Sequence, residues 1–245
     1  MNEITAQISG QLNTWKYKRA HPYKINEVEK IIAESVKAGL PIPLFGYWGV
    51  GNKADCNEAE ANSVGYLNSL VQSINKIYSP GVQVTFILSD IHADNNCIPK
   101  DTIGEYIKKM QMMFRENNFK MILLSELYSK YGLSSESVLE DASINNKIWW
   151  QFFPLKKDLI KQANNVSLCS DKGLSAKCYA VMRKNESEIL EKEFANQIFI
   201  TYSAPHYRML YPNLPTLYLY SEKKGCCTVP WFTYVDGDSV RINED

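Results

Sequence analysis

Two carboxylates and an imidazole stand close together in the first half of the chain, in the stretch 89–96 (SDIHADNN). They follow residues 82–88 (VQVTFIL), a short apolar run rich in β-branched residues that predicts a strand buried on both faces. In open α/β sheets, ligands bind just beyond the carboxyl ends of the strands. We therefore interpret Asp90, His92 and Asp94 as candidate acid–base catalysts, with an ordinary polar loop as the alternative.

Basic and aromatic residues follow other predicted strands. The strand predicted at 43–48 runs into a glycine-rich segment that ends in Lys53, which could hold a phosphate or a carboxylate, or be a flexible turn with a surface lysine. The spacing matches neither a Walker loop nor the dinucleotide fingerprint. We predict a catalytic role for Lys53 beside the acid–base group. Further residues at or near strand ends are predicted to bind the substrate: Tyr47, Trp48, Arg183, Tyr202, His206, Arg208 and Trp231.

Amphipathic segments alternate with the apolar runs. They predict helices at 26–37, 58–78 and 99–117 between strands at 43–48, 82–88 and 120–127. Strand–helix–strand units at this spacing indicate an α/β fold with a mostly parallel, doubly wound sheet and helices on both faces. A parallel sheet aligns the carboxyl ends of its strands, so the candidate residues are expected to meet at one rim.

The second half of the chain is predicted to continue this pattern. Residues 177–183 (KCYAVMR) favour a strand ending in Arg183, with a helix from 184 to about 195 and a strand at 198–202. Segments 217–220 and 227–235 are expected to be antiparallel strands added at an edge of the sheet. The first alternates between side-chain types, and the second contains Pro230, which suits an edge strand. We predict an N-terminal arm at 1–23 and a single catalytic domain at 24–245.

The net charge, the apolar runs and the cysteine spacing indicate which partners and which cell compartment to expect. The 245 residues include 27 basic and 27 acidic side chains, so net charge favours neither nucleic acid nor an anionic membrane as a partner. No apolar run approaches the roughly 20 residues of a spanning helix, and residues 1–11 are polar, so we expect a cytoplasmic protein. The six cysteines form no C-x-x-C pair and are predicted to be reduced packing residues.

The D-x-H sequence at 90–92 is similar to the opening motif of calcineurin-like metallophosphoesterases. That family also needs later G-D and G-N-H-[DE] motifs with further histidines, whereas this chain has three histidines, His21, His92 and His206, none of them in such a motif. A metal-dependent phosphoesterase is therefore kept as an alternative. We expect no bound transition metal, because such sites usually need three or more protein ligands.

A second resemblance extends over more of the chain. The motif IYSPG at 77–81 precedes the apolar strand, Ser89-Asp90 and then Tyr106 in the next predicted helix. Three later stretches follow in order: CYAVMRKNE at 178–186, ITYSAPH at 200–206 and TVPWF at 228–232. Over residues 40–240 the chain resembles the isonitrile synthase family, the pyoverdine and dityrosine biosynthesis group.

The resemblance implies a Rossmann-like enzyme that needs neither a metal nor a redox cofactor. Members of the family condense the amino group of tyrosine or tryptophan with a carbonyl carbon of ribulose 5-phosphate to form an isonitrile, and fungal relatives make N-formyl tyrosine. The expected partners are these small molecules, with a downstream oxygenase in the same pathway. Forming an imine requires proton transfer, which Asp90, His92 or Asp94 could supply. Basic residues at strand ends would hold the phosphate and the carboxylate.

The sequence departs from the family pattern at two motifs. Ile91 replaces the glycine of the S-D-G motif, Val229 is inserted in the late T-P-W-H motif, and Phe232 replaces its histidine. These differences leave three alternatives open. They are a divergent transferase acting on another amine, an N-formylating relative, and a non-catalytic ligand-binding protein with the same fold.

Overall fold

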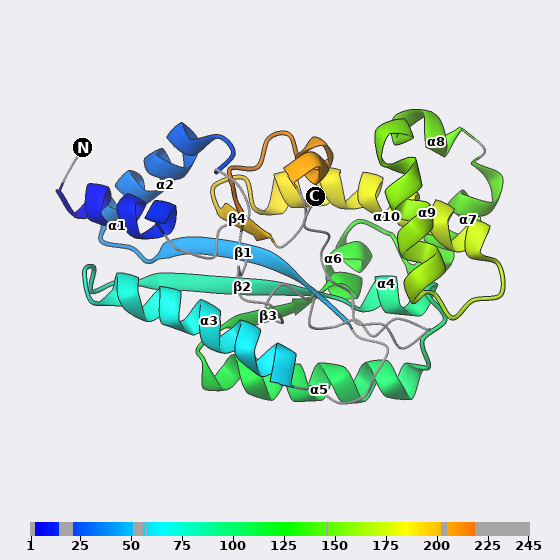
Figure 1. The fold of residues 1–245 in the computed structure, drawn as a ribbon, viewed down its shortest axis with the longest axis horizontal. Helices are drawn as coiled ribbons and strands as arrows, with labels where there is room; N and C mark the ends of the chain where they lie inside the picture. The colour runs from blue at the N-terminus through cyan, green and yellow to red at the C-terminus, as the bar shows by residue number, and fades with distance from the viewer. Residues whose placement is uncertain are drawn as a thin grey trace.

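A parallel β-sheet forms the centre of the protein (Figure 1). The computed structural model describes residues 3–14, 22–50, 56, 58–145, 147–201 and 205–218. Within these ranges the five strands lie in the order β3-β2-β1-β4-β5 and every neighbouring pair is parallel. This is the strand order of a Rossmann-like sheet, with the reversal between β1 and β4. The strands are β1 (Ile42–Gly49), β2 (Val82–Ser89), β3 (Lys120–Leu123), β4 (Ile198–Thr201) and β5 (Thr216–Tyr218).

Helices cover both faces of the sheet, so the predicted doubly wound α/β architecture is confirmed. One layer contains α1 (Glu3–Thr14), α2 (Ile25–Ala38), α3 (Glu58–Asn75) and α5 (Lys100–Glu116). The opposite layer contains α4 (Asp90–Asn95), α6 (Leu124–Lys130), α7 (Ser135–Ile144), α8 (Ile148–Gln151), η1 (Phe153–Leu155), α9 (Lys156–Val166), α10 (Lys172–Glu193) and η2 (Pro205–Leu210). No helix in the described part of the chain is long and apolar enough to cross a membrane.

Strand β1 contributes to both hydrophobic layers, because successive side chains of a strand point to opposite faces. Phe45 and Tyr47 pack in the layer that contains α10, whereas Leu44 and Trp48 pack in the layer that contains α3 and α5. Gly46 pairs with Ile200 of β4 and leaves no room for a side chain, since a Cβ there would sit 2.7 Å from the carbonyl oxygen of Ile200. These neighbours fix the position of the carboxyl end of β1.

Two predicted strands differ from the structure. Residues 177–183 are not a strand, because they lie inside α10, which begins after the N-cap Asp171. Side chains around almost the whole circumference of this helix are buried, and such a helix segment gives the same apolar run as a buried strand. The third strand ends at Leu123 and the chain turns into α6, so the strand predicted to 127 is too long.

The edge of the sheet and the polar stretch 89–96 also differ from expectation. Strand β5 is parallel to β4, so the predicted antiparallel strand at 217–220 is wrong, while the predicted strand at 227–235 lies outside the described residues. Most of the predicted polar loop forms the short helix α4. The segment predicted as an N-terminal arm contains α1, whose Ile8 and Leu12 are buried in the core.

One pair of cysteines is oxidised, which contradicts the prediction that all six are reduced. Cys97 and Cys169 form a disulfide that joins two segments 72 residues apart, with their Cα atoms 5.2 Å from each other. Sequence spacing gives no indication of this pair, since the two residues meet only through the packing of α4 against α10. Cys178 is a buried free thiol.

Candidate active site

A buried ionic network joins α4 to α10 beneath the carboxyl ends of the strands. His92 Nε2 contacts Glu186 Oε1, and the Arg183 guanidinium donates from Nη1 to Glu186 Oε2 at 2.8 Å. Glu186 has no exposed surface, and His92 is 7% exposed. A carboxylate is thus held between an imidazole and a guanidinium, away from solvent.

Two tyrosines complete the surroundings of this network. The Tyr211 hydroxyl lies 3.3 Å from both Glu186 Oε2 and Arg183 Nη1, so it can accept from the arginine and donate to the carboxylate. The Tyr47 ring lies beneath the Arg183 guanidinium at 5.8 Å, and its centroid is 6.3 Å from that of His92. The five side chains come from β1, α4, α10 and the segment after η2, elements that are far apart in the sequence.

Local structure explains why these side chains converge. Strand β2 ends at Ser89, and α4 begins at the next residue, so His92 lies on the first turn beyond the sheet. Arg183 and Glu186 are three residues apart on α10, which places both on one face of the helix. Tyr47 is near the end of β1, next to the point between β1 and β4 where the strand order reverses, and ligands of doubly wound folds bind there.

The network keeps Glu186 ionised. Burial by itself would raise the pKa of this carboxyl group, but the neighbouring charges of His92 and Arg183 outweigh burial and lower the pKa to about 2. Burial, and then the negative charge of Glu186, raise the pKa of Tyr47 well above its usual value. The site therefore presents a fixed carboxylate behind the imidazole and a phenol that remains protonated at neutral pH.

Two buried donors face this site without a hydrogen-bond partner in the described part of the chain: the Tyr47 hydroxyl and Arg183 Nε. Leaving buried polar groups unpaired costs about 1–3 kcal/mol each, so such groups usually have a reason. A phenol and a guanidinium are typical partners of carboxylate and phosphate oxygens. The arrangement can therefore bind an anion next to the His92 imidazole.

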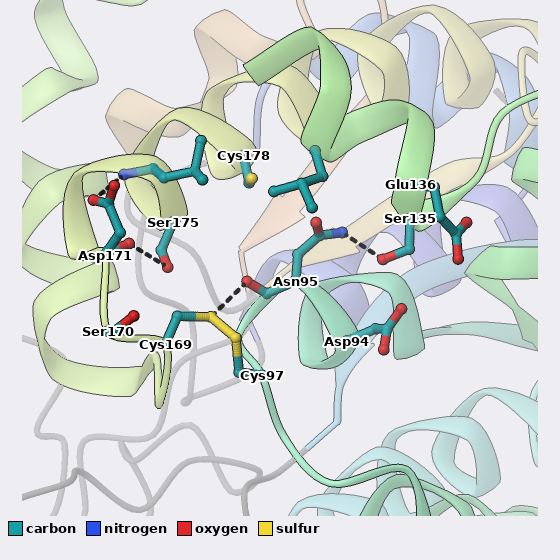
Figure 2. Close-up of a pocket in the computed structure, with 12 residues that line it drawn as sticks. Asp94, Asn95, Cys97, Ser135, Glu136, Cys169, Ser170, Asp171, Ser175 and Cys178 are labelled. Atoms are coloured by element: carbon teal, nitrogen blue, oxygen red, sulfur yellow. Dashed lines mark hydrogen bonds between the residues drawn. A yellow bond between two sulfur atoms is a disulfide. The ribbon is translucent and has the colours of Figure 1, made fainter. Parts of the chain in front are cut away.

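The three candidate catalysts of the stretch 89–96, Asp90, His92 and Asp94, lie in different surroundings. Asp90 accepts a hydrogen bond from the Ser125 backbone at 3.0 Å, at the start of α6, and burial raises its pKa. Asp94 lies on the wall of a cavity of about 350 Å³ between α4, α7 and α10 (Figure 2). Of the three, His92 is the one that joins the network with Glu186, and catalytic roles for Asp90 and Asp94 stay predictions.

The remaining predicted site residues lie in several places. Trp48 is buried on the other face of the sheet, where its Nε1 donates to the Tyr106 hydroxyl at 3.1 Å. Arg208 stacks over the ring of Tyr23 at 5.5 Å. The backbone of His206 forms part of η2. Lys53, Tyr202 and Trp231 lie outside the described residues.

Glu186 and Tyr211 were missed from the sequence. The spacing of Arg183 and Glu186 would have indicated an ion pair on one helix face, but a strand predicted at 177–183 places them in different elements. Tyr211 gives no sequence pattern, because it reaches the site only through the turn after η2. No group of three or more potential metal-ligating side chains occurs within the described ranges, and the absence of a resident metal stays a prediction.

Comparison with known proteins gives two matches. A family model described as pyoverdine/dityrosine biosynthesis protein matches residues 50–199, a range that contains His92, Arg183 and Glu186. Among solved structures, the fold is similar to that of the PvcA protein from Pseudomonas aeruginosa, with a TM-score of 0.59 and 19% sequence identity, covering 88% of this chain and 83% of PvcA. No protein with a curated description matches the chain.

Proposed function

This chain belongs to the pyoverdine/dityrosine biosynthesis protein family, and we propose that it is a biosynthetic enzyme that condenses an amine with a keto sugar phosphate. The substrates that fit the family resemblance are an aromatic amino acid, tyrosine or tryptophan, and ribulose 5-phosphate, with an isonitrile as product. The observation that supports this proposal best is the buried contact between His92 and Glu186, next to donors of Arg183 and Tyr47 that have no partner among the described residues.

His92 is proposed to move protons during imine formation. Attack of the amine on the ketone produces a carbinolamine, and loss of water from it requires a proton at the departing hydroxyl. His92 Nε2 contacts Glu186, which leaves Nδ1 for exchange with the substrate. The negative charge of Glu186 stabilises the imidazolium that forms when His92 accepts a proton, as the buried aspartate does in Ser-His-Asp triads.

Arg183 and Tyr47 are proposed to bind an anionic group of the substrate. The guanidinium donates from Nη1 to Glu186 and to the Tyr211 hydroxyl, and its buried Nε has no partner among the described residues. Together with the Tyr47 hydroxyl, it can contact two oxygens of a carboxylate or a phosphate. This contact would orient the amine relative to His92.

The proposal is tested by incubating the purified protein with tyrosine or tryptophan and ribulose 5-phosphate, followed by mass spectrometry. An isonitrile and an N-formyl product differ by one water, so mass also distinguishes the N-formylating alternative. Replacing His92 with glutamine should lower the rate by about 100-fold or more, the usual contribution of a general acid–base group. The matched control is Glu188→Gln, which alters an exposed carboxylate on the same helix as Glu186.

Two results would contradict the proposal. If the folded His92→Gln variant turns over at the rate of the control, His92 does not transfer the proton. If no product forms with either amino acid while both bind, the chain is a ligand-binding member of the family.

A further inference from the structure

The Cys97–Cys169 disulfide closes one end of the interface between α4 and α10, and the contact between His92 and Glu186 closes the other. We propose that this disulfide is an exchange site for small thiols, and that its redox state sets how firmly His92 is held against Glu186. The structural part of the proposal is independent of the proposed function, whereas its effect on turnover rests on it.

Helices α4 and α10 run antiparallel where they pack against each other. His92 meets Glu186, and four residues later the side chain of Asn96 donates to the Tyr179 hydroxyl at 2.7 Å. The next residue, Cys97, forms the disulfide. The interface is thus held by a polar contact near each end and by a single covalent bond beyond Asn96.

The partner cysteine belongs to a connection that is attached to the start of α10. Cys169 lies between α9 and α10, and the neighbouring Ser167 Oγ is 2.8 Å from Ser175 Oγ on the first turn of α10. The backbone of Leu168 donates to the carbonyl oxygen of Asn96 at 2.8 Å. These hydrogen bonds remain when the disulfide opens, so reduction should loosen the interface without unfolding the protein.

The sulfur atoms are accessible to a small thiol. Cys97 is exposed and Cys169 half-buried, and Figure 2 shows their disulfide on the wall of the cavity that also contains Asn95 and Ser170. The cavity of about 350 Å³ is large enough for a molecule of the size of a simple dithiol. Cys178 lines the same cavity, but burial raises its pKa to about 11, so its thiol does not compete in exchange.

The exchange reaction balances with a thiol as the reductant. A thiolate attacks the exposed Cys97 sulfur, the bond between the two protein sulfurs breaks, and Cys169 leaves as a thiolate. A second thiol attacks the mixed disulfide and releases Cys97. Two thiols are oxidised to one disulfide, the protein disulfide takes up two electrons, and both cysteine thiolates are protonated from solvent.

Opening the disulfide should affect His92 because α4 is short. The helix has six residues, its first follows β2 directly, and its last is two residues before Cys97. Without the covalent bond, the far end is held by hydrogen bonds alone: Asn95 donates to Ser135 Oγ at 3.0 Å, and Asn96 donates to the Tyr179 hydroxyl at 2.7 Å. We expect turnover to fall by about tenfold on reduction, since a misplacement of about 1 Å in a catalytic group costs up to about 100-fold.

The test compares the oxidised protein, the protein reduced with dithiothreitol, and a Cys97→Ser/Cys169→Ser double variant. Alkylation and mass spectrometry report which thiols are open, and hydrogen exchange reports the protection of the α4 amides, such as the Asn96 N–H that bonds the His92 carbonyl oxygen at 3.0 Å. We expect reduction of this pair in the folded state, faster exchange in α4, and slower turnover. The double variant should match the reduced protein and show no response to dithiothreitol.

The proposal fails if the disulfide resists dithiothreitol until the protein unfolds, or if hydrogen exchange of the α4 amides is the same in both redox states. It also fails if the double variant still responds to dithiothreitol. If hydrogen exchange in α4 differs between the redox states but no product forms in either state, the proposed function is contradicted and the redox-dependent interface is supported.

Discussion

Replacing Glu186 with glutamine should lower the free energy of unfolding by about 3 kcal/mol at neutral pH. The carboxyl pKa falls from 4.5 to about 2 in the folded protein, and one pKa unit is worth about 1.36 kcal/mol. Removing the carboxylate also leaves the Arg183 guanidinium buried without a counter-charge, and breaking a buried pair costs about 3–5 kcal/mol. Urea denaturation followed by circular dichroism measures the loss.

The stability difference between wild type and Glu186→Gln should change with pH, whereas the effect of a simple packing defect would not. Because folding depresses the pKa of Glu186, its stabilisation is present above about pH 4.5 and is lost as the pH falls towards about 2. The difference between wild type and Glu186→Gln should therefore shrink over that window, while Glu188→Gln stays close to wild type throughout. A difference that is constant from about pH 6 to about pH 2.5 would refute the reasoning, since Glu186 would then not be held ionised by its neighbours.

Two further predictions concern backbone geometry and the cap of α6. Gly46→Ala should destabilise the protein by about 1–3 kcal/mol because its Cβ would meet the Ile200 carbonyl oxygen, whereas Gly104→Ala in α5, where nothing lies within 4 Å, should stabilise by up to about 1 kcal/mol. Urea denaturation of the two variants compares them, and shifts in the same direction would contradict the prediction. Asp90→Ala should cost about 1–2 kcal/mol and speed hydrogen exchange at the Ser125 amide, which loses its acceptor. Unchanged exchange there would show that Asp90 does not cap α6.

The central strands could be predicted because burial on both faces leaves a continuous apolar run of the right length. The predicted 43–48 and 82–88 correspond to β1 and β2, and the positions of α2, α3 and α5 follow from their amphipathic stripes. Only the second half of helix α10 was recognised, as the helix predicted from 184. The first half is buried on most of its circumference, so its sequence shows neither an apolar stripe nor a polar face, and tertiary burial decides its structure.

Of three residues of the site, His92 could be predicted from the sequence, whereas Glu186 and Tyr211 could not. His92 follows a buried strand, and the position of a polar residue beyond a strand end can be read from the sequence. Its neighbour Glu186 depends on the assignment of α10, and Tyr211 depends on a turn that no local pattern determines. The disulfide could not be predicted either, because Cys97 and Cys169 are brought together by the packing of helices that are distant in sequence.

The alternation of Tyr47 and Trp48 along β1 has a practical consequence for anyone who modifies this protein. The strand contributes Tyr47 to the buried polar network on one side and Trp48 to the aromatic core on the other. Substitutions in the α3 and α5 layer can be screened for thermal tolerance with little effect on the chemistry of the opposite layer. A one-residue deletion in β1 would instead exchange its two faces along the rest of the strand. Mutant libraries can therefore treat the two helical layers separately, provided that the length of β1 is kept unchanged.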